Sequence, residues 1–453
     1  MALSVIILAA GKGTRMKSSM PKVLHKLADK PLLEHVYESA KALNAEEIVI
    51  VYGHGGEQVL DACQHFDAAW VEQTEQLGTG HAVQYGLEKV KLENNVLILY
   101  GDVPLTRKRS LEQLLDDMQD KLALMTVHLD DPAGYGRIIR DAHDRVTGIV
   151  EQKDASEVQK QIQEVNTGIL AVKGALLKDY LDRIDNNNAQ KEYYLTDIFS
   201  LAAKDGVEII TSHPADIFEV EGINNRRQLA ALERVHQLNL AGQLMDDGVT
   251  IIDPARIDIR GDVSIQADVT IDVNVILKGT VSIGSGTVIG ANCIIVNSVL
   301  GNNITVEPNS VIENAVVENA VSIGPFARIR PDTHLAEKCR IGNFVEVKKS
   351  RIGKGSKVNH LSYIGDTVMG DNVNVGAGTI TCNYDGANKH QTIIGDNVFV
   401  GSDTQMVAPV KVADNVTVAA GTTLTRDVEE GVLVISRVPQ KSVAGWERPK
   451  KQK

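Results

Sequence analysis

The sequence predicts an α/β domain, then a connecting helix, then a parallel β-helix. Three observations support this fold class. Short β-branched runs alternate with amphipathic stretches through the first half of the chain. Apolar residues recur at helical spacing over residues 226–245. An aliphatic residue then returns at every sixth position through most of the second half. Because 453 residues exceed what one hydrophobic core usually serves, more than one domain is expected.

The first half is interpreted as an α/β sheet with parallel strands at its centre. Strands are predicted over 5–8, 48–51 and 96–100, and helices around 32–42 and 82–90. The apolar opening is interpreted as a buried strand, not as a secretion signal, because no basic region precedes it and no cleavage site follows. The connecting helix is predicted to end at Asp246-Asp247-Gly248.

The second half carries a hexapeptide repeat. A six-residue period fits neither a helix nor a flat strand, so each aliphatic residue is predicted to point inward from one of three faces of a coil. The repeat runs from about Val249 to Asp427, which allows roughly ten coils. Its register slips between Val347 and Ile352, and an inserted loop is predicted between Ile380 and Gln391. The predicted inward residues are Ile259, Ile265, Ile271, Leu277, Ile283, Ile289, Ile295, Val311, Val317, Ile323, Ile329, Leu335, Ile341, Val347, Ile352, Val358, Ile364, Ile394, Val400, Met406, Val412, Val418 and Leu424.

Composition narrows the classes of partner and the compartment. A formal net charge of -12 argues against non-specific binding to nucleic acid or to an anionic membrane. The four cysteines are widely spaced and form no Cys-x-x-Cys pair, so a reduced compartment is expected and the protein is interpreted as cytoplasmic. No apolar stretch approaches the roughly 20 residues that a membrane helix needs.

A β-helix has flat flanks that must be covered by something else. Packing of like solenoids side by side would cover them, and a three-sided prism presents equivalent faces. We therefore expect a closed cyclic homo-oligomer, with a trimer favoured.

A glycine-containing loop follows the first strand. It reads Leu8-Ala9-Ala10-Gly11-Lys12-Gly13-Thr14-Arg15-Met16, and Pro21-Lys22 comes soon after. Glycines let backbone amides approach phosphate oxygens, and the side chains of Lys12, Arg15 and Lys22 add positive charge. Although Gly-x-Gly alone would be an ordinary turn, the whole string after a strand predicts a phosphate-binding loop.

Asp102 follows the predicted strand over 96–100, in Tyr100-Gly101-Asp102-Val103-Pro104. Ligands of open α/β sheets bind at the carboxyl ends of the strands, so this carboxylate is expected near the phosphates. Mg²⁺ takes one or two protein oxygens and completes its octahedron with phosphate and water. Asp102 is therefore predicted to be a magnesium ligand.

These residues carry a resemblance to a known family. The first half resembles the sugar-phosphate nucleotidyltransferases. From Leu3 to about Arg437 the chain resembles the bacterial bifunctional N-acetylglucosamine-1-phosphate uridylyltransferases and glucosamine-1-phosphate N-acetyltransferases. The resemblance implies a Rossmann-like nucleotidyltransferase domain over 1–225, a linker helix over 226–248, and a left-handed β-helix acetyltransferase domain with a C-terminal tail over 249–453.

For the first domain the resemblance implies transfer of uridylyl from UTP to N-acetylglucosamine 1-phosphate, with Mg²⁺. It assigns Arg15 and Lys22 to the reacting phosphates. Asp102 and Asn224 would hold the metal. No protein nucleophile is needed, because the sugar phosphate attacks the α-phosphorus of UTP in line. The nucleotide and sugar-nucleotide would be held by Leu8, Ala9, Ala10, Gly11, Lys22, Gln73, Gly78, Thr79, Tyr100, Gly101, Asp102, Gly136, Glu151, Asn166 and Asn224.

A second candidate site lies on the β-helix. His360 falls between the inward Val358 and Ile364, so its side chain is predicted to point outward. A lone outward histidine is usually solvated surface, but cationic and polar residues of neighbouring coils are predicted beside this one. The resemblance implies that His360 is the general base for acetyl transfer from acetyl-CoA to glucosamine 1-phosphate, at a site shared by adjacent subunits. It implies an amino-sugar site at Arg330, Lys348, Tyr363 and Asn374, and an acetyl-CoA path along Ala377, Asn383, Tyr384, Ser402, Ala420 and Arg437.

Three alternatives stay open from the residues alone. The β-helix could serve only oligomerisation or regulation, leaving the uridylyltransferase as the single activity. It could be a metal hydratase using His334, His360 and His390, although these histidines are widely spaced. The whole chain could be a structural scaffold, which would leave the phosphate loop unexplained.

Overall fold

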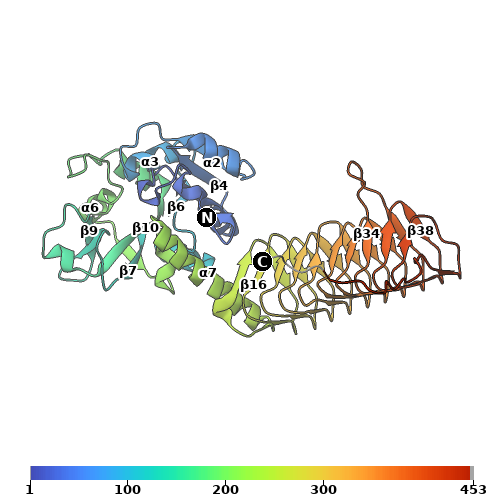
Figure 1. The fold of residues 1–453 in the computed structure, drawn as a ribbon. Coiled ribbons are helices and arrows are strands. Elements are labelled where there is room, and N and C mark those ends of the chain that lie inside the picture. The colour runs from blue at the N-terminus through green and yellow to red at the C-terminus, as the bar shows by residue number, and fades with distance from the viewer. Residues whose placement is uncertain (1, 449–453) are drawn as a thin grey trace. The chain divides into compact units, whose positions relative to one another are not determined.

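The computed structural model describes residues 2–448, so the last five residues of the predicted C-terminal tail lie outside the described residues. The chain divides into two compact units between His236 and Gln237. The predicted connecting helix is present as α7 (Arg226–Asp246), which runs across this boundary (Figure 1). Within the described residues, no helix is long and apolar enough to cross a membrane.

The first unit is built on one mixed sheet in the order β11-β7-β10-β6-β1-β4-β5. Strands β6, β1, β4 and β5 are parallel, as predicted, whereas β10 runs antiparallel to β6 and β7. The strands span β1 (Leu3–Leu8), β4 (Glu47–Tyr52), β5 (Ala69–Glu72), β6 (Asn95–Tyr100), β7 (Leu122–His128), β10 (Glu164–Lys173) and β11 (Ile209–Ser212). Two further hairpins are β8 (Arg137–Arg140) with β9 (Val146–Val150), and β2 (Lys26–Leu27) with β3 (Lys30–Pro31).

Helices cover both faces of this sheet, and each face buries its own core. One core takes in apolar side chains of α1 (Leu32–Ala42), α2 (Gly56–Cys63) and α4 (Lys108–Met118). The other takes in those of α3 (Thr79–Leu87), α5 (Gly174–Leu181) and α6 (Asp197–Lys204). Strands β1 and β6 are buried on both faces, which is why their sequences are almost continuously apolar. A ligand site is therefore expected at their carboxyl ends.

The second unit is a parallel β-helix of three sheets, with eleven, ten and nine strands within the described residues. The first sheet comprises β12 (Thr250–Ile251), β15 (Thr270–Ile271), β18 (Val288–Ile289), β21 (Thr305–Val306), β24 (Ser322–Ile323), β27 (Arg340–Asn343), β30 (Lys357–His360), β33 (Asn374–Val375), β36 (Phe399–Val400), β39 (Thr417–Val418) and β41 (Leu433–Val434). The second comprises β13 (Ile257–Arg260), β16 (Val275–Lys278), β19 (Ile294–Val296), β22 (Val311–Glu313), β25 (Arg328–Ile329), β28 (Glu346–Lys348), β31 (Tyr363–Gly365), β34 (Ile380–Cys382), β37 (Gln405–Val407) and β40 (Thr423–Leu424). The third comprises β14 (Val263–Ile265), β17 (Val281–Ile283), β20 (Val299–Leu300), β23 (Ala315–Val317), β26 (Thr333–Leu335), β29 (Arg351–Ile352), β32 (Thr367–Met369), β35 (Thr392–Ile394) and β38 (Val410–Val412).

The aliphatic residues predicted to point inward form one continuous core, with two exceptions. Ile265, in the third strand of the unit, is only partly buried. Val311 was predicted wrongly, because Ile295 pairs with Ile312, which is fully buried, while Val311 lies on the outer side of the strand. The coil that joins Ile295 to Ile312 is one residue shorter than a run of three hexapeptides, so the inward position moves by one.

The register slip and the insertion both have a structural cause. Val347 pairs with Ile329 eighteen residues before it and with Ile364 seventeen residues after it, so the slip is one shortened coil and both flanking residues stay inward. Met369 pairs with Ile394, twenty-five residues on. The extra residues form the predicted loop, which projects from the β-helix beside β34 in Figure 1 and is bridged by Tyr384 and Lys389.

Candidate functional site

A cavity of about 500 Å³ opens where β1 and β6 end. It brings together ten of the predicted nucleotide-site residues, which come from four separate segments. These are Leu8, Ala9, Ala10, Gly11, Lys22, Gln73, Gly78, Thr79, Tyr100 and Asp102. Sequence reasoning missed two polar residues that also line the cavity, Gln76 and Glu192. Lys12, which it noted as a positive charge beside the loop, lines the cavity as well.

Close packing shapes the predicted phosphate-binding loop on one side of this cavity. Gly13 has φ +58, and a Cβ there would lie 2.6 Å from Cβ of Lys22, so glycine lets the two segments meet. The Gln76 side chain donates to the carbonyl of Ala10 at 3.0 Å, and the Gly101 amide donates to the carbonyl of Leu8 at 2.9 Å. These contacts use carbonyl oxygens of the loop, and the amide of Ala9 donates to the carbonyl of Val51 at 2.8 Å. The amides of Gly11 and Lys12 have no backbone partner among the described residues and remain available to an anion.

Two oxygen ligands converge beside the loop. Lys22 forms an ion pair with Asp102, and its Nζ also donates to Asn224 Oδ1 at 3.2 Å. Arg15 donates to the same Asn224 oxygen at 2.9 Å. The amide of Ile223 donates to the carbonyl of Asp102 at 2.9 Å, which ties the end of β6 to the segment that carries Asn224. A carboxylate and an amide oxygen around one cation is a donor set that fits Mg²⁺.

The predicted sugar-binding residues lie outside that cavity but next to one another. A Cβ at Gly136 would lie 3.5 Å from Glu151 Oε1 and 3.6 Å from Cβ of Asn166, so glycine keeps this place open. Thr196 donates to Glu151 Oε1 at 3.0 Å. Burial raises the pKa of the Glu151 carboxyl, and burial beside Glu151 and Asp102 raises the pKa of Tyr100 well above its usual value. Tyr100 therefore lies within electrostatic range of Glu151, a predicted sugar-binding residue, and of Asp102, a predicted metal ligand.

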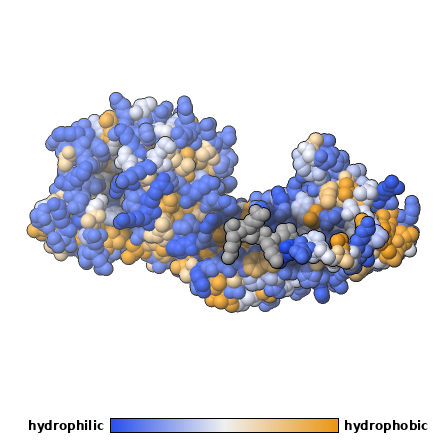
Figure 2. Space-filling model, viewed as in Figure 1, coloured by the Kyte–Doolittle hydropathy of each residue, from blue (hydrophilic) through white to orange (hydrophobic). Residues whose placement is uncertain are grey.

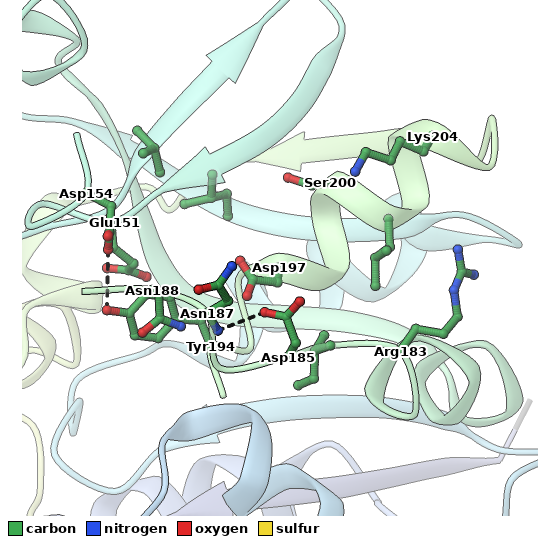
Figure 3. A pocket seen from close by; sticks show the side chains of 14 residues that line it. Glu151, Asp154, Arg183, Asp185, Asn187, Asn188, Tyr194, Asp197, Ser200 and Lys204 are labelled. Atoms are coloured by element: carbon green, nitrogen blue, oxygen red, sulfur yellow. Dashed lines mark hydrogen bonds between the residues drawn. The ribbon is translucent and has the colours of Figure 1, made fainter. Parts of the chain in front are cut away.

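Glu151 lines a second cavity of about 360 Å³, which Figure 3 shows with Asp154, Asp185 and Asp197 around it. Tyr194 donates to Asp154 at 3.4 Å. Burial, together with the charges of the neighbouring carboxylates, raises the pKa of Asp197 to about 6. Sequence reasoning missed this acidic group, because its members come from three segments without a shared motif.

On the β-helix, strand register aligns the second set of predicted residues. Val358 pairs with Val375, Val375 with Val400 and Val400 with Val418. Because parallel neighbours keep their register, the residues two positions further on form a row along the corner of the prism. That row is His360, Ala377, Ser402 and Ala420, and Arg437 donates to the carbonyl of Ala420 at 2.9 Å. The sequence assigned these residues one by one, and the structure places them in one line.

His360 is exposed, as predicted, and its Nδ1 lies 3.1 Å from Oδ1 of Asn343 on the preceding coil. An amide oxygen only accepts, so Nδ1 carries the proton in this contact, and in the neutral ring Nε2 is then the nitrogen with the lone pair. Asn343 was missed from the sequence, although it stands seventeen positions before His360, the length of one shortened coil.

The predicted amino-sugar residues lie on four successive coils. Arg330, Lys348 and Tyr363 belong to the second sheet or its edge, whereas Asn374 lies in the sheet of His360, where it pairs with Lys357. Arg330 and Lys348 follow paired residues of β25 and β28, and Arg330 donates to Glu346 at 2.6 Å. Tyr363 pairs with Glu346 in the next coil, and its hydroxyl lies 3.5 Å from Asn383. Glu346 raises the pKa of Arg330 further, so the guanidinium is held in place as a fixed positive charge.

Histidine metal sites find little support among the described residues. His334 pairs with Glu318 and His390 with Asp385, while His360 bonds Asn343, so the three histidines of the metal-hydratase alternative have different partners. His128, Glu164 and His213 do lie close enough to share an ion. Arg140, however, already binds both oxygens of Glu164, at 2.8 and 2.7 Å, which accounts for the buried carboxylate without a metal.

Models of known protein families match a segment in each half of the chain. Residues 5–172 match the MobA-like NTP transferase domain, and residues 311–428 match the GMPPB C-terminal domain. Two solved structures, a UDP-glucose pyrophosphorylase with UDP-glucose and a nucleotidyl transferase from Methanothermobacter, are each 18% identical, with TM-scores of 0.42 and 0.38. The first match covers 52% of this chain and 98% of the pyrophosphorylase chain, and the second covers 53% of this chain and 99% of the nucleotidyl transferase chain. The bifunctional protein GlmU of Marinobacter nauticus is 55% identical over 99% of both chains. The chain therefore belongs to the family of the bifunctional protein GlmU.

Proposed function

We propose that the chain catalyses two consecutive reactions. The β-helix unit transfers acetyl from acetyl-CoA to glucosamine 1-phosphate. The α/β unit then transfers uridylyl from UTP to the resulting N-acetylglucosamine 1-phosphate, which gives UDP-N-acetylglucosamine and pyrophosphate. The full-length match to a bifunctional GlmU carries this proposal, and each unit contains a group of residues suited to its reaction.

In the α/β unit, the sugar phosphate oxygen attacks the α-phosphorus of UTP in line, and pyrophosphate leaves. The protein positions two anions and neutralises the charge that develops on the leaving group. Arg15 and Lys22 supply fixed positive charge, and both already contact the metal-ligand pair. Asp102 and Asn224 would hold Mg²⁺, which when bound supplies further positive charge to the phosphates. Gly136, Glu151 and Asn166 would hold the acetylated sugar.

In the β-helix unit, His360 acts as general base. Its Nε2 takes the proton from the amine of glucosamine 1-phosphate as the amine nitrogen attacks the thioester carbon, and the proton then passes to the CoA sulfur as the C–S bond breaks. Asn343 holds the ring in the tautomer that this step needs. Arg330 and Lys348 suit the sugar phosphate, with Tyr363 and Asn374 beside it.

The acetyl-CoA path is proposed along the corner row that starts at His360. Small side chains at Ala377, Ser402 and Ala420 leave room for an extended ligand along the coils, and Arg437 provides a positive charge at the far end. The projecting loop adds Asn383, which is buried against Asp366, and Tyr384, which is exposed.

A homotrimer is proposed through the flanks of the β-helix. Four aliphatic side chains point outward from the third sheet, with exposed fractions between 38% and 51% in the single chain: Val299, Val316, Val368 and Ile393. In the strand register, His334 and Arg351 stand between Val316 and Val368 in the same outward row, so the row offers two aliphatic pairs. Aliphatic pairs on a flat face favour burial against another copy.

The proposal is tested by following free thiol and pyrophosphate separately. Glucosamine 1-phosphate with acetyl-CoA should release thiol without added metal, and N-acetylglucosamine 1-phosphate with UTP should release pyrophosphate only with Mg²⁺. A chelator should therefore stop the second product alone. Pyrophosphate without any thiol would leave the β-helix as a scaffold and would favour the single-activity alternative.

A further inference from the structure

The nucleotide cavity contains a histidine that the proposed chemistry does not use. Gln73 follows β5, is 4% exposed and lines the cavity. His81 lies in the first turn of α3, and its Nδ1 is 3.2 Å from Nε2 of Gln73. The same amide nitrogen lies 3.2 Å from the carbonyl oxygen of Gly78.

These two contacts determine the orientation of the Gln73 amide. A carbonyl oxygen can only accept, so the group beside Gly78 must be the NH₂ and not the oxygen. The second proton of that NH₂ then points to His81, whose Nδ1 must be the accepting nitrogen of a neutral ring protonated at Nε2. Both donors of Gln73 are therefore used by the protein. Its Oε1 has no hydrogen-bond partner among the described residues. It is also not among the fully buried polar atoms without a partner, so it is not fully buried.

Both acceptors are themselves held in place. Gly78 has φ +114, and a Cβ there would lie 2.6 Å from the carbonyl oxygen of Tyr193, so only glycine directs its carbonyl this way. The His81 ring packs edge-on against Tyr85 at 4.9 Å between centroids and lies roughly parallel to the Tyr193 ring at 6.3 Å. The ring therefore has little freedom to turn Nδ1 away from Gln73.

We propose that His81 is a positioning residue that fixes the Gln73 amide with its oxygen facing the cavity, so that the site selects a nucleobase with a ring N–H. An acceptor oxygen pairs with the N3–H of uracil, whereas N3 of cytosine is itself an acceptor and would leave both atoms unpaired. This inference rests on the proposed uridylyl transfer and assigns its pyrimidine selectivity to His81 acting through Gln73.

The test compares kcat/KM for UTP and for CTP in pyrophosphate release. His81→Phe keeps a ring between Tyr85 and Tyr193 but removes the acceptor. We expect the UTP:CTP ratio to fall about fivefold or more, mainly through a higher KM for UTP. His81→Asn places an amide oxygen near the position of Nδ1 and should restore the ratio to within about twofold. A ratio unchanged in His81→Phe would overturn the inference.

A double-mutant cycle isolates the route of the effect. In a Gln73→Ala background, His81→Phe should leave the UTP:CTP ratio unchanged, and a further fall would show that His81 acts other than through Gln73. Thiol release by the β-helix unit and the thermal unfolding transitions report whether each variant is folded, and His81→Leu replaces His81→Phe if the latter is not. If the wild type releases no pyrophosphate from UTP, the proposed function fails, which is a separate result from an unchanged ratio.

Discussion

The two units build their sites in opposite ways. In the α/β unit, the nucleotide cavity gathers short segments that are far apart in sequence, from Leu8 to Glu192, at the carboxyl ends of parallel strands. In the β-helix unit, the proposed acetyl-CoA path is one position repeated on successive coils, from His360 to Ala420. Proximity in a solenoid therefore follows from the repeat length, whereas proximity in the α/β unit depends on sheet topology.

The two sites also differ in how far their charged side chains are exposed to solvent. The α/β unit keeps its site charges partly buried, with Lys22 and Asp102 only 14% and 15% exposed. His360 on the β-helix is exposed, and its positively charged neighbour Arg330 is more than a third exposed. Charge changes in the α/β unit should therefore have large effects, while the β-helix site should respond mainly to shape and to loss of the base.

The largest effect expected without removing the proposed base or a proposed metal ligand comes from the cation Lys22. Lys22→Ala should lower uridylyl transfer by about 10²–10³-fold, because it removes fixed positive charge from the reacting phosphates. Initial rates of pyrophosphate release measure this, and thiol release should be unchanged. Lys26→Ala, an exposed lysine four residues on, is the matched control. Equal rates of pyrophosphate release in the wild type and Lys22→Ala would show that Lys22 has no part in uridylyl transfer.

A smaller effect is expected from blocking the corner row. Ala420→Phe places a ring in the line between Ser402 and Arg437 and should raise the KM for acetyl-CoA about tenfold, in keeping with a steric cost of about 1–3 kcal/mol. The KM for glucosamine 1-phosphate should change little. Thr423→Phe puts the same ring on another face of the coil as a control. If both variants behave alike, the proposed path does not follow this corner.

The smallest effect is on stability and concerns Asp197, whose pKa is raised to about 6 by burial and by Asp185, Glu151 and Asp154. An acid with a raised pKa in the folded state binds its proton more tightly there, so its contribution to stability is present below about pH 4 and is lost as pH rises through about 6. Relative to the wild type, Asp197→Asn should therefore gain about 1–3 kcal/mol between pH 4 and pH 8.

Calorimetry of the full chain measures this gain as a rise of roughly 2–8 °C in the unfolding transition of the α/β unit, relative to the wild type at the same pH. Asp116→Asn, on the exposed face of α4, should show no pH-dependent gain. A gain that grows towards low pH would contradict the assigned direction of the pKa shift.

The same contrast explains what the sequence could predict. Nearly every residue that the hexapeptide period predicted as inward is buried in the β-helix core, although that core also contains residues it did not name, such as Leu300 and Met369. The period failed at Val311 because a one-residue deletion in a turn leaves no mark except the shift itself. The strand–loop pattern placed the predicted phosphate-binding loop and Asp102 at one site, and both line the same cavity. It did not reveal Asn343, because the coil between Asn343 and His360 is one residue shorter than the regular repeat. It could not reveal His81 beside Gln73, because a hydrogen-bond partner outside a repeat has no required spacing. The acidic cavity beside Glu151 was invisible for the same reason.

The most direct test of two separate sites in one chain uses two variants in one assay. Wild type, Asp102→Ala and His360→Ala are each given glucosamine 1-phosphate, N-acetylglucosamine 1-phosphate, acetyl-CoA, UTP and Mg²⁺, and thiol and pyrophosphate are followed together. We predict that Asp102→Ala loses pyrophosphate alone and that His360→Ala loses thiol alone, by about 10²–10⁴-fold. Loss of both products in either variant, or thiol release that survives in His360→Ala, would contradict the account.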